Sequence, residues 1–513
     1  MAMTDEQLAE VLERVDELVI GAMNEDAAPG MGVGIVRGSE TIYAKGFGLA
    51  DAARERPVSP RTVFRLGSIS KTMTAIGLMQ LWEQGFFGLD DPVNDHLKHY
   101  QVNRPDRATP PVTFRHLLTH ISGIGELRGV TDLFKPVIGL GTKPGKPVPT
   151  PAQYYPKGLR PAVRPGTKWV YSNHAFNTLG QLVEDISGEP FVEYMRRQVF
   201  EPLGMENTDY VPSERSREAL AQGYSFSRGA LKPVDYLEIT ARGAGSVFST
   251  VEDMCLYVAA LLGGGANGRG KVLNRETLSV MTEPHYRLDE RLPAMGLALL
   301  LDDFGGHKVA SHDGGWPGFL SSMHICPAFE VGVVVFVNAS SRAAHEAADG
   351  LMRGLLGVPE PSSRLPRAGV LESPHLWPEL RGFYGPEGPL NTNLRLWGTY
   401  AGELEVRVEG KHLVLRALAG PLRKGGRLYP IDSLDPLAFE VLVEGQAHPV
   451  VFGREREGGR VNRLCVGFDR LTRRPRAGSM RFKAQAGAGM IAATGLAVAT
   501  WIGVSVLRVP KER

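Results

Sequence analysis

Cysteine is scarce in this chain, and its scarcity excludes two classes of protein. The 513 residues contain three cysteines, Cys255, Cys326 and Cys465, which are odd in number and far apart. A disulfide-stapled secreted domain or a cysteine-ligated zinc domain needs more thiols at closer spacing. We therefore expect each cysteine to be a small, buried, apolar residue.

An excess of charge of either sign is also missing. The 58 basic and 56 acidic side chains leave a formal net charge of +2. Binding of nucleic acid usually needs a strong basic excess, so no such partner is expected.

The first ten residues, MAMTDEQLAE, lack the positive charge and apolar run of a secretory signal. No export signal is therefore predicted.

Charged residues are absent from the stretch 486–507. As a helix it would span roughly 33 Å, enough to cross the hydrocarbon core of a bilayer. We predict a transmembrane helix that makes the protein membrane-associated, with a docking or oligomerising helix as the alternative because glycines dilute its hydrophobicity. Basic residues are more numerous before the stretch than after it. This bias favours a cytoplasmic location for the preceding part of the chain.

The chain is longer than one hydrophobic core normally holds, so two folded domains are expected. Residues 358–374 are rich in proline and polar side chains and are predicted to be a linker. The first domain is then 1–357. Short alternating segments with turns in 375–472 predict a small antiparallel β domain.

The pattern within 1–357 predicts an α/β fold. Segments typical of strands occur at both ends of this region, and helical patterns lie between Met73 and Met254. The predicted strands are 32–37, 41–45, 295–301, 321–325 and 331–337. We expect an antiparallel sheet flanked by helices, plus an all-helical region. The stretch 127–164 has little periodicity and is predicted to be a lid or a disordered insertion.

Ser68 and Lys71 open a segment with a helical pattern, 68–85. Three positions are nearly one helical turn, so the hydroxyl and the amine are expected on one face. A serine attacks only after a base takes its proton, and a lysine is such a base where burial or positive charge lowers its pKa. The plain alternative is a capping serine with an exposed lysine.

Tyr171 and Asn173 lie on an expected loop just before a helix over 175–186. A phenol beside a lysine can move protons, and an asparagine amide can hold both the lysine and a substrate carbonyl. The alternatives are a half-buried core tyrosine and a helix cap.

A third segment joins His312 to the pair Gly314 and Gly315. Glycines beside an edge strand let a substrate approach the backbone, and exposed N–H groups there stabilise an oxyanion. Trp316 follows directly and is a candidate for the wall of the substrate pocket. His312 alone would be a structural histidine.

Together these segments resemble the serine β-lactamase and penicillin-binding-protein superfamily. The order and spacing of Ser68-x-x-Lys71, Tyr171-x-Asn173 and His312-x-Gly314 are similar to its class C-like branch of esterases, D-aminopeptidases and β-lactamase-related hydrolases. The resemblance runs from about Gln7 to Leu356. It implies a β-lactamase/transpeptidase-like catalytic domain, and a lipocalin-like barrel for 375–472.

The resemblance also implies roles for single residues. Ser68 would be acylated, while Lys71 and Tyr171 would share general-base and general-acid duty. The backbone N–H groups of Ser68 and Gly315 would form an oxyanion hole. Residues implied to bind or orient the substrate are Asn173, His312, Gly314, Gly315 and Trp316.

The substrate class is predicted from one difference between this chain and the antibiotic-degrading members of the superfamily. Antibiotic-degrading relatives of class A carry Lys-Thr-Gly where this chain has His312-Asp313-Gly314. A histidine is mostly uncharged at pH 7 unless a partner such as Asp313 favours its charged form, so it should attract a substrate carboxylate less.

We therefore predict a serine hydrolase that acts on esters or small amides through an acyl-enzyme. Alternatives are a D-amino-acid peptidase or carboxypeptidase, a weak β-lactamase, and a non-catalytic penicillin-binding-type sensor or self-assembling scaffold. The oligomeric state stays open.

No cofactor and no metal are predicted. His116 and His120 have the spacing of helix-borne zinc ligands but lack the accompanying glutamate and a third ligand. Gly30-x-Gly32-x-Gly34 lacks the preceding strand of a dinucleotide site and is interpreted as a flexible entry into the first strand.

Overall fold

The structure is a computed structural model that describes residues 5–360, 365–456 and 458–480. These residues form two compact units. The first consists of 5–285 and 295–358, and the second of 286–294 and 359–480. The chain leaves the first unit at Val358, at the start of the predicted linker.

A largely antiparallel sheet organises the first unit, as predicted. Seven consecutive strands of this sheet are, in spatial order, β12 (Leu300–Phe304), β13 (His307–Trp316), β14 (Phe319–Cys326), β15 (Val331–Val337), β1 (Gly30–Arg37), β2 (Glu40–Asp51) and β3 (Arg56–Pro57). Strands from the two ends of this region pair directly, with Val33 opposite Val335. Two further short strands are β10 (Tyr286–Arg287) and β11 (Ala294–Met295).

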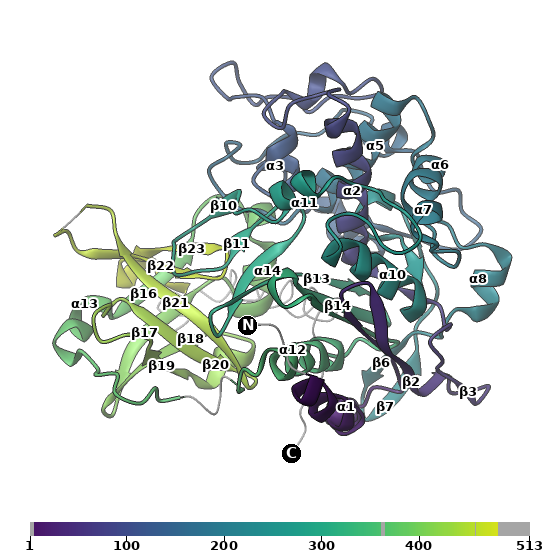
Figure 1. The fold of residues 1–513 in the computed structure, drawn as a ribbon. Helices are drawn as coiled ribbons and strands as arrows, with labels where there is room; N and C mark the ends of the chain where they lie inside the picture. The colour runs from purple at the N-terminus through teal and green to yellow at the C-terminus, as the bar shows by residue number, and fades with distance from the viewer. Residues whose placement is uncertain (1–4, 361–364, 457, 481–513) are drawn as a thin grey trace. The chain divides into compact units, whose positions relative to one another are not determined.

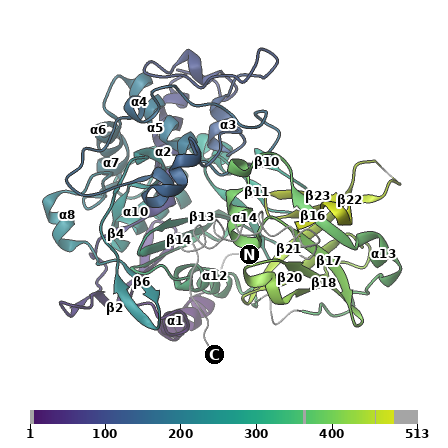
Figure 2. The ribbon, with the colours of Figure 1, turned by 180° about the vertical axis from the view of Figure 1, so that it is seen from behind.

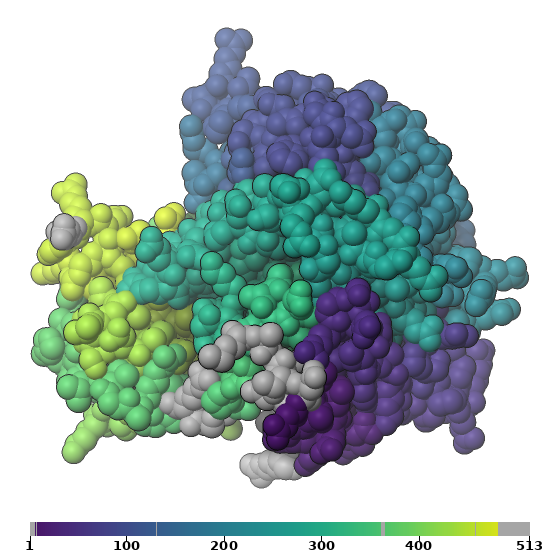
Figure 3. Space-filling model, viewed as in Figure 1, coloured from purple at the N-terminus to yellow at the C-terminus, as the bar shows by residue number. Residues whose placement is uncertain are grey.

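Helices cover both faces of the sheet because its central strands are apolar on both sides. In β15, Val334 and Phe336 pack with α10 (Val251–Leu262), whereas Val333 and Val335 pack with α1 (Asp5–Glu25) and α12 (Ala343–Leu356). This alternation follows from the two-residue period of a strand. Figures 1 and 2 show α10 on one side of β13 and β14 and α12 on the other, and Figure 3 shows α1 at the surface.

The glycines of β1 are packing sites. They lie inside the strand, which corrects the interpretation as a flexible entry. A β-carbon on Gly32 would lie 2.7 Å from a methyl group of Val251, and one on Gly34 would lie 2.5 Å from the sulfur of Cys255. Glycine therefore lets α10 approach the sheet closely.

A helical region lies above the sheet (Figure 1), as predicted for Met73 to Met254, but it also contains short strands and is therefore not all-helical. Its helices are α2 (Ser70–Glu83), α3 (Phe114–Leu118), α4 (Pro151–Tyr154), α5 (Asn173–Ser187), α6 (Phe191–Met195), α7 (Glu201–Leu203), α8 (Glu214–Ala219), α9 (Arg242–Gly245) and α11 (Arg275–Met281). Almost every residue of α2 is buried, as expected for a helix that is apolar on all sides. Short strand pairs link the region: β4 (Phe64–Arg65) with β9 (Phe248–Ser249), β5 (Gly141–Thr142) with β8 (Glu238–Ile239), and β6 (Tyr224–Ser227) with β7 (Ala230–Pro233).

The stretch 127–164 is anchored to the core. Arg128 pairs with the buried Asp132 at 2.9 Å, and its guanidinium lies 3.6 Å from the ring centroid of Tyr154. Tyr155 is buried, and its hydroxyl lies 3.0 Å from Nδ1 of His174. These contacts correct the expectation of a disordered insertion.

The second unit is a closed antiparallel barrel, which refines the predicted small β domain. Its strands are β16 (Gly382–Pro386), β17 (Leu404–Glu409), β18 (His412–Ala417), β19 (Gly426–Pro430), β20 (Ala438–Val443), β21 (Gln446–Arg454), β22 (Val461–Val466) and β23 (Asp469–Arg474), with helices α13 (Trp377–Leu380) and α14 (Leu394–Tyr400). Pairing of β16 with β23 closes the barrel. Large side chains such as Tyr384, Phe439 and Phe452 fill its interior.

The predicted membrane helix at 486–507 lies outside the described residues. Within the described ranges, none of the helices combines the length and apolar character that crossing a bilayer requires. The three cysteines are free and buried, which confirms their predicted role as small apolar residues.

Candidate active site

Ser68 lies on a short turn that the chain holds from both sides. The turn is a 3-10 segment, Gly67–Ile69, and α2 begins only at Ser70, two residues later than the sequence predicts. The Ser70 hydroxyl donates to the Gly67 carbonyl at 2.6 Å and accepts the Val247 N–H at 3.0 Å. Ser68 itself is partly exposed while its neighbours are buried. The turn is therefore held rigidly, and it leaves the hydroxyl of Ser68 accessible.

Lys71 is completely buried directly behind Ser68. Its Nζ donates to Oγ of Ser68 at 2.9 Å, to Oδ1 of Asn173 at 2.8 Å and to the carbonyl of Ala244 at 2.7 Å. An ammonium group carries three donors, so three acceptors match its charged form. The structure therefore brings the predicted serine and lysine together, in surroundings that suit a charged amine.

Tyr171 also contacts Ser68. Its hydroxyl donates to Oγ of Ser68 at 2.6 Å. The Tyr171 ring centroid lies 4.8 Å from Nζ of Lys71, and the ring of Phe176 lies 5.7 Å from it. A serine hydroxyl, an amine and a phenol thus meet at one point, as general acid–base chemistry requires.

Asn173 is free to face this cluster because another residue caps the helix. The Ser172 side chain accepts the Ala175 N–H at 3.2 Å and is the N-cap of α5. Asn173 is the first residue of the helix, and its amide oxygen contacts Lys71. The cap that sequence interpretation offered for Asn173 belongs to Ser172.

The glycine pair of β13 packs against the turn that carries Ser68. A β-carbon on Gly67 would lie 2.6 Å from the nitrogen of Gly315, and one on Gly314 would lie 1.9 Å from the carbonyl oxygen of Leu66. The Ser321 hydroxyl also donates to that carbonyl, at 2.7 Å. Only glycine permits this contact between backbones, which brings Gly315 next to Ser68.

His312 and Asp313 face opposite sides of the sheet. The His312 ring is buried, and its Nδ1 donates to the Asp313 carbonyl at 2.7 Å. The Asp313 carboxylate instead accepts from the Ser322 hydroxyl at 2.6 Å and pairs with Nδ1 of His345 on α12 at 3.1 Å. The carboxylate suggested as a partner for His312 is therefore engaged elsewhere.

Trp316 is 9% exposed and packs on a buried arginine. The Arg65 guanidinium lies 4.9 Å from the Trp316 ring centroid, 4.9 Å from that of Tyr236 and 5.1 Å from that of Phe248. Burial lowers the pKa of Arg65 to about 10, which leaves it charged at neutral pH. The main contact shown for Trp316 is this cation–π packing, so its predicted role in a pocket wall stays a prediction.

Two residues contact this cluster that sequence interpretation did not assign to it. The carbonyl of Ala244 accepts from Lys71, and the His120 ring stacks on Tyr171 with centroids 4.3 Å apart. Backbone acceptors leave no sequence signal. His120 and His116 have the spacing of a zinc pair, but Nδ1 of each ring accepts a backbone N–H, from Thr113 for His116 and from Ser172 for His120.

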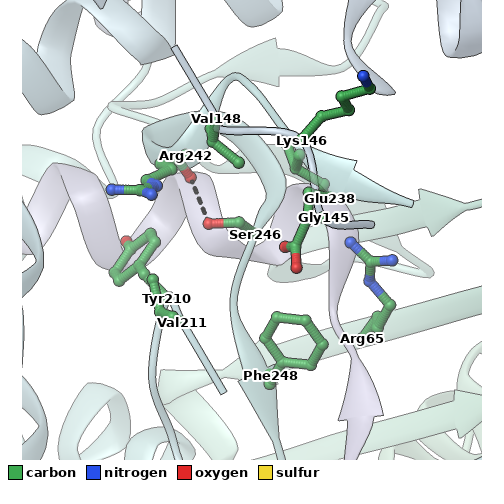
Figure 4. A pocket seen from close by; sticks show the side chains of 11 residues that line it. Arg65, Gly145, Lys146, Val148, Tyr210, Val211, Glu238, Arg242, Ser246 and Phe248 are labelled. Atoms are coloured by element: carbon green, nitrogen blue, oxygen red, sulfur yellow. Dashed lines mark hydrogen bonds between the residues drawn. The ribbon is translucent and has the colours of Figure 1, made fainter. Parts of the chain in front are cut away.

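A pocket of about 140 Å³ lies beside Arg65. It is lined by residues of β4, β8, β9 and the loop 145–148, and Ser68, Lys71 and Tyr171 are not among them. Figure 4 shows the amine of Lys146 and the guanidinium of Arg242 directed away from its centre. The basic Arg65 and the acidic Glu238 also line the pocket, so its lining contains groups of both signs.

Comparison with known proteins gives one family match and many relatives. A family model described as Beta-lactamase matches residues 15–356. Esterase EstB of Burkholderia gladioli is 28% identical over 335 residues, which cover 62% of this chain and 82% of the esterase. AmpH of Escherichia coli K12, described as a D-alanyl-D-alanine-carboxypeptidase/endopeptidase, is 25% identical over 321 residues, which cover 61% of this chain and 80% of AmpH.

A solved structure is similar over a longer part of the chain. The octameric penicillin-binding protein homologue from Pyrococcus abyssi matches with a TM-score of 0.61 and 25% identity. The match covers 90% of this chain and 99% of that structure. Such a share exceeds the first unit, so the likeness includes part of the second.

Proposed function

Because the chain belongs to the beta-lactamase family, whose model matches residues 15–356, we propose that it hydrolyses esters or small amides through an acyl-enzyme on Ser68. The observation that supports this proposal most directly is the double contact of the Ser68 Oγ. It lies 2.9 Å from the amine of Lys71 and 2.6 Å from the hydroxyl of Tyr171. A nucleophile held between two groups that carry protons is the arrangement that covalent catalysis needs.

Tyr171 acts in this proposal as a phenolate, formed when its hydroxyl loses its proton to solvent. In the first step, this phenolate takes the proton of Ser68 while Oγ attacks the substrate carbonyl carbon. Lys71 has its three donors directed at acceptors, so it serves better as a fixed positive charge than as the first proton acceptor. That charge stabilises the anionic form of Tyr171 and the developing negative charge on Ser68. The proton then passes from Tyr171 to the leaving alcohol or amine, the bond to that group breaks, and the acyl group stays on Oγ.

Deacylation repeats these steps with water as the nucleophile. Tyr171 takes a proton from water, the oxygen of the resulting hydroxide bonds to the acyl carbon, and the proton returns to Oγ of Ser68 as the acid leaves. The N–H groups of Ser68 and Gly315 are the proposed oxyanion donors in both steps. The close contact of Gly67 with Gly315 supports this assignment, because it holds both segments in a fixed relation.

Esters are the favoured substrates because the site has no lysine at the position of His312. A neutral histidine attracts a substrate carboxylate less than an ammonium does. The similarity to esterase EstB supports the same choice. Residual β-lactam turnover is compatible with a serine nucleophile at this site.

A D-amino-acid peptidase or carboxypeptidase is the second candidate. The similarity to AmpH favours it, and the same nucleophile would serve both reactions. Turnover of D-alanyl peptides compared with nitrophenyl esters separates the two. A non-catalytic sensor or scaffold is disfavoured by the intact cluster of Ser68, Lys71 and Tyr171.

Membrane attachment through 486–507 is part of the proposal as a separate prediction. Its alternative is a docking or oligomerising helix. Flotation of the full chain with lipid vesicles, compared with a chain that ends at Met480, tests it without reference to catalysis.

Intact-mass analysis after treatment with a fluorophosphonate tests the chemistry. We expect one adduct on the wild type and none on Ser68→Ala. Ser213→Ala is the matched control, because Ser213 caps the exposed helix α8, and it should be labelled as the wild type is. Absence of an adduct on folded wild-type protein would refute the proposed reaction and favour the scaffold.

A further inference from the structure

His120 holds the backbone of Tyr171 at both of its ends. The His120 carbonyl accepts the Val170 N–H at 2.7 Å, and Nδ1 of its ring accepts the Ser172 N–H at 3.1 Å. Val170 and Ser172 are the residues immediately before and after Tyr171. His120 and Ser172 are 52 positions apart in the sequence, so a distant segment fixes this short piece of chain.

The His120 ring also fixes the plane of the phenol. The two ring centroids are 4.3 Å apart and the planes differ by 27°. Phe176 lies on the same side of the cluster, 5.0 Å from the His120 ring. Stacked aromatic surfaces resist rotation about the bond that carries the ring. The phenol oxygen therefore stays directed towards Ser68.

The backbone of His120 is itself in an unusual conformation. Its φ is +60°, in the left-handed region that residues with a β-carbon rarely adopt, and the residue is completely buried. Histidine, asparagine and aspartate enter this region more readily than most residues. This conformation gives one residue both a carbonyl and a ring acceptor for the two N–H groups around Tyr171.

The imidazole of His120 is neutral in this arrangement. Nδ1 can accept a hydrogen bond from Ser172 only when it carries no proton, which places the ring proton on Nε2. Oγ of Ser68 accepts hydrogen bonds from Lys71 and Tyr171, and the His120 ring stacks on Tyr171. We therefore expect His120 to affect the reaction through Tyr171.

We propose that His120 is a positioning residue that sets the direction of the Tyr171 phenol, so that its hydroxyl remains in reach of Ser68. This inference rests on the proposed function, in which Tyr171 takes the proton of Ser68. It assigns His120 to the surroundings of the acid–base cluster rather than to a metal site.

Two substitutions of His120 separate its contributions. His120→Gly accepts the left-handed backbone but removes both the ring and the Nδ1 acceptor, and should slow fluorophosphonate labelling by about 100-fold. His120→Asn keeps a side-chain acceptor and tolerates the backbone, and should slow labelling by only about tenfold. His324→Asn is the matched control, since this buried histidine contacts Ser322 and Phe304 instead, and should label within about twofold of the wild type.

A double-mutant cycle distinguishes positioning from a general loss of stability. In a Tyr171→Phe background the hydroxyl is absent, so His120→Gly should slow the residual labelling by less than about threefold. An equal loss in both backgrounds would overturn the inference. If His120→Gly does not fold, the same cycle with His120→Asn gives the answer.

A crystal structure of His120→Gly or His120→Asn tests the positioning role without an activity measurement. We expect the Tyr171 hydroxyl to leave its position 2.6 Å from Oγ of Ser68. An unmoved phenol overturns the inference, even where Ser68-dependent labelling supports the proposed reaction. Wild-type protein that takes no label refutes the reaction instead, while a displaced phenol still supports the positioning role.

Discussion

The Tyr171 hydroxyl donates a hydrogen bond to Oγ of Ser68 at 2.6 Å, although 103 positions separate the two residues. Ser68 stands on a turn before α2, and Tyr171 on the loop before α5. Packing of these two helices therefore determines whether the serine has a proton acceptor at all. The contact is a property of the whole helical region rather than of either motif.

Removal of the Tyr171 hydroxyl should abolish most of the reaction and leave the fold intact. We expect Tyr171→Phe to lower the rate of acylation by about 10²- to 10⁴-fold, the usual contribution of a general base. Stopped-flow release of nitrophenol measures it. Tyr43→Phe is the control, because Tyr43 also loses a bond of 2.6 Å, to Asp16, far from Ser68. Similar slowing in both variants would contradict the assigned role.

Two adjacent glycines should respond differently to alanine. A β-carbon on Gly314 would lie 1.9 Å from the Leu66 carbonyl, so the strand must move. We expect Gly314→Ala to cost roughly 1–3 kcal/mol of stability and to slow acylation more than tenfold, about the effect of disturbing one oxyanion donor.

Gly315→Ala is the matched control for this prediction. A β-carbon there meets no atom within 4 Å, and the N–H group is retained. Its stability should stay within about 0.5 kcal/mol of the wild type. Denaturant titration and burst kinetics of both variants check the pair, and equal effects would argue against the close approach at Gly314.

The sequence predicts the elements of the site better than its finer geometry. Ser68 and Lys71 are three positions apart, and local helical geometry alone places them on one face. Even so, Ser68 lies on a 3-10 turn and α2 starts two residues later, because Ser70 uses its hydroxyl to hold Gly67 and Val247. Such a tertiary hydrogen bond has no periodic signal.

Residues that act through their backbone are the ones that sequence reasoning misses. The Ala244 carbonyl completes the shell of Lys71, and any residue type has a carbonyl. His120 does carry a side-chain signal, but its spacing from His116 suggests only a zinc pair, which lacks the other ligands. Only the fold shows that its ring faces Tyr171. Membrane attachment stays a prediction, since the stretch 486–507 is outside the described residues. The predicted domain boundaries also stay predictions.

Replacement of His312 by lysine should change the substrate preference. An ammonium at this position attracts the carboxylate of a β-lactam, while the ester lacks that group. We expect His312→Lys to raise β-lactam turnover and to lower ester turnover. Steady-state kcat/KM for nitrocefin and for a nitrophenyl ester measure the ratio. His312→Gln controls for loss of the ring, and an unchanged ratio in His312→Lys would contradict the prediction.

The pair of Asp313 and His345 should make the stability of the catalytic unit depend on pH. Burial lowers the pKa of His345, but attraction to Asp313 and the hydrogen bond that the ring donates to this carboxylate raise the pKa above its usual value. Burial raises the pKa of Asp313, but His345, His324 and the Ser322 hydroxyl lower it well below its usual range. Arg342 opposes the charge on His345, and Glu346 reinforces it.

The raised pKa of His345 and the lowered pKa of Asp313 define the pH range in which the pair stabilises the protein. A raised histidine pKa contributes stability below about pH 6.5, which is lost as the pH rises through the raised value. A lowered carboxyl pKa contributes stability above about pH 4, which is lost only as the pH falls through the lowered value. The side chains are 31% and 45% exposed, so the pair should be worth roughly 1 kcal/mol or less.

His345→Gln should therefore destabilise the protein most between about pH 4 and 6.5, and little in alkaline solution. Urea unfolding of the wild type and of His345→Gln at pH 5 and at pH 9 measures how much this destabilisation changes with pH. In an Asp313→Asn background the same substitution has no carboxylate to lose, so its cost should no longer vary with pH. A cost that is equal at both pH values in the wild-type background would show that His345 supports β13 by packing alone and not by its charge.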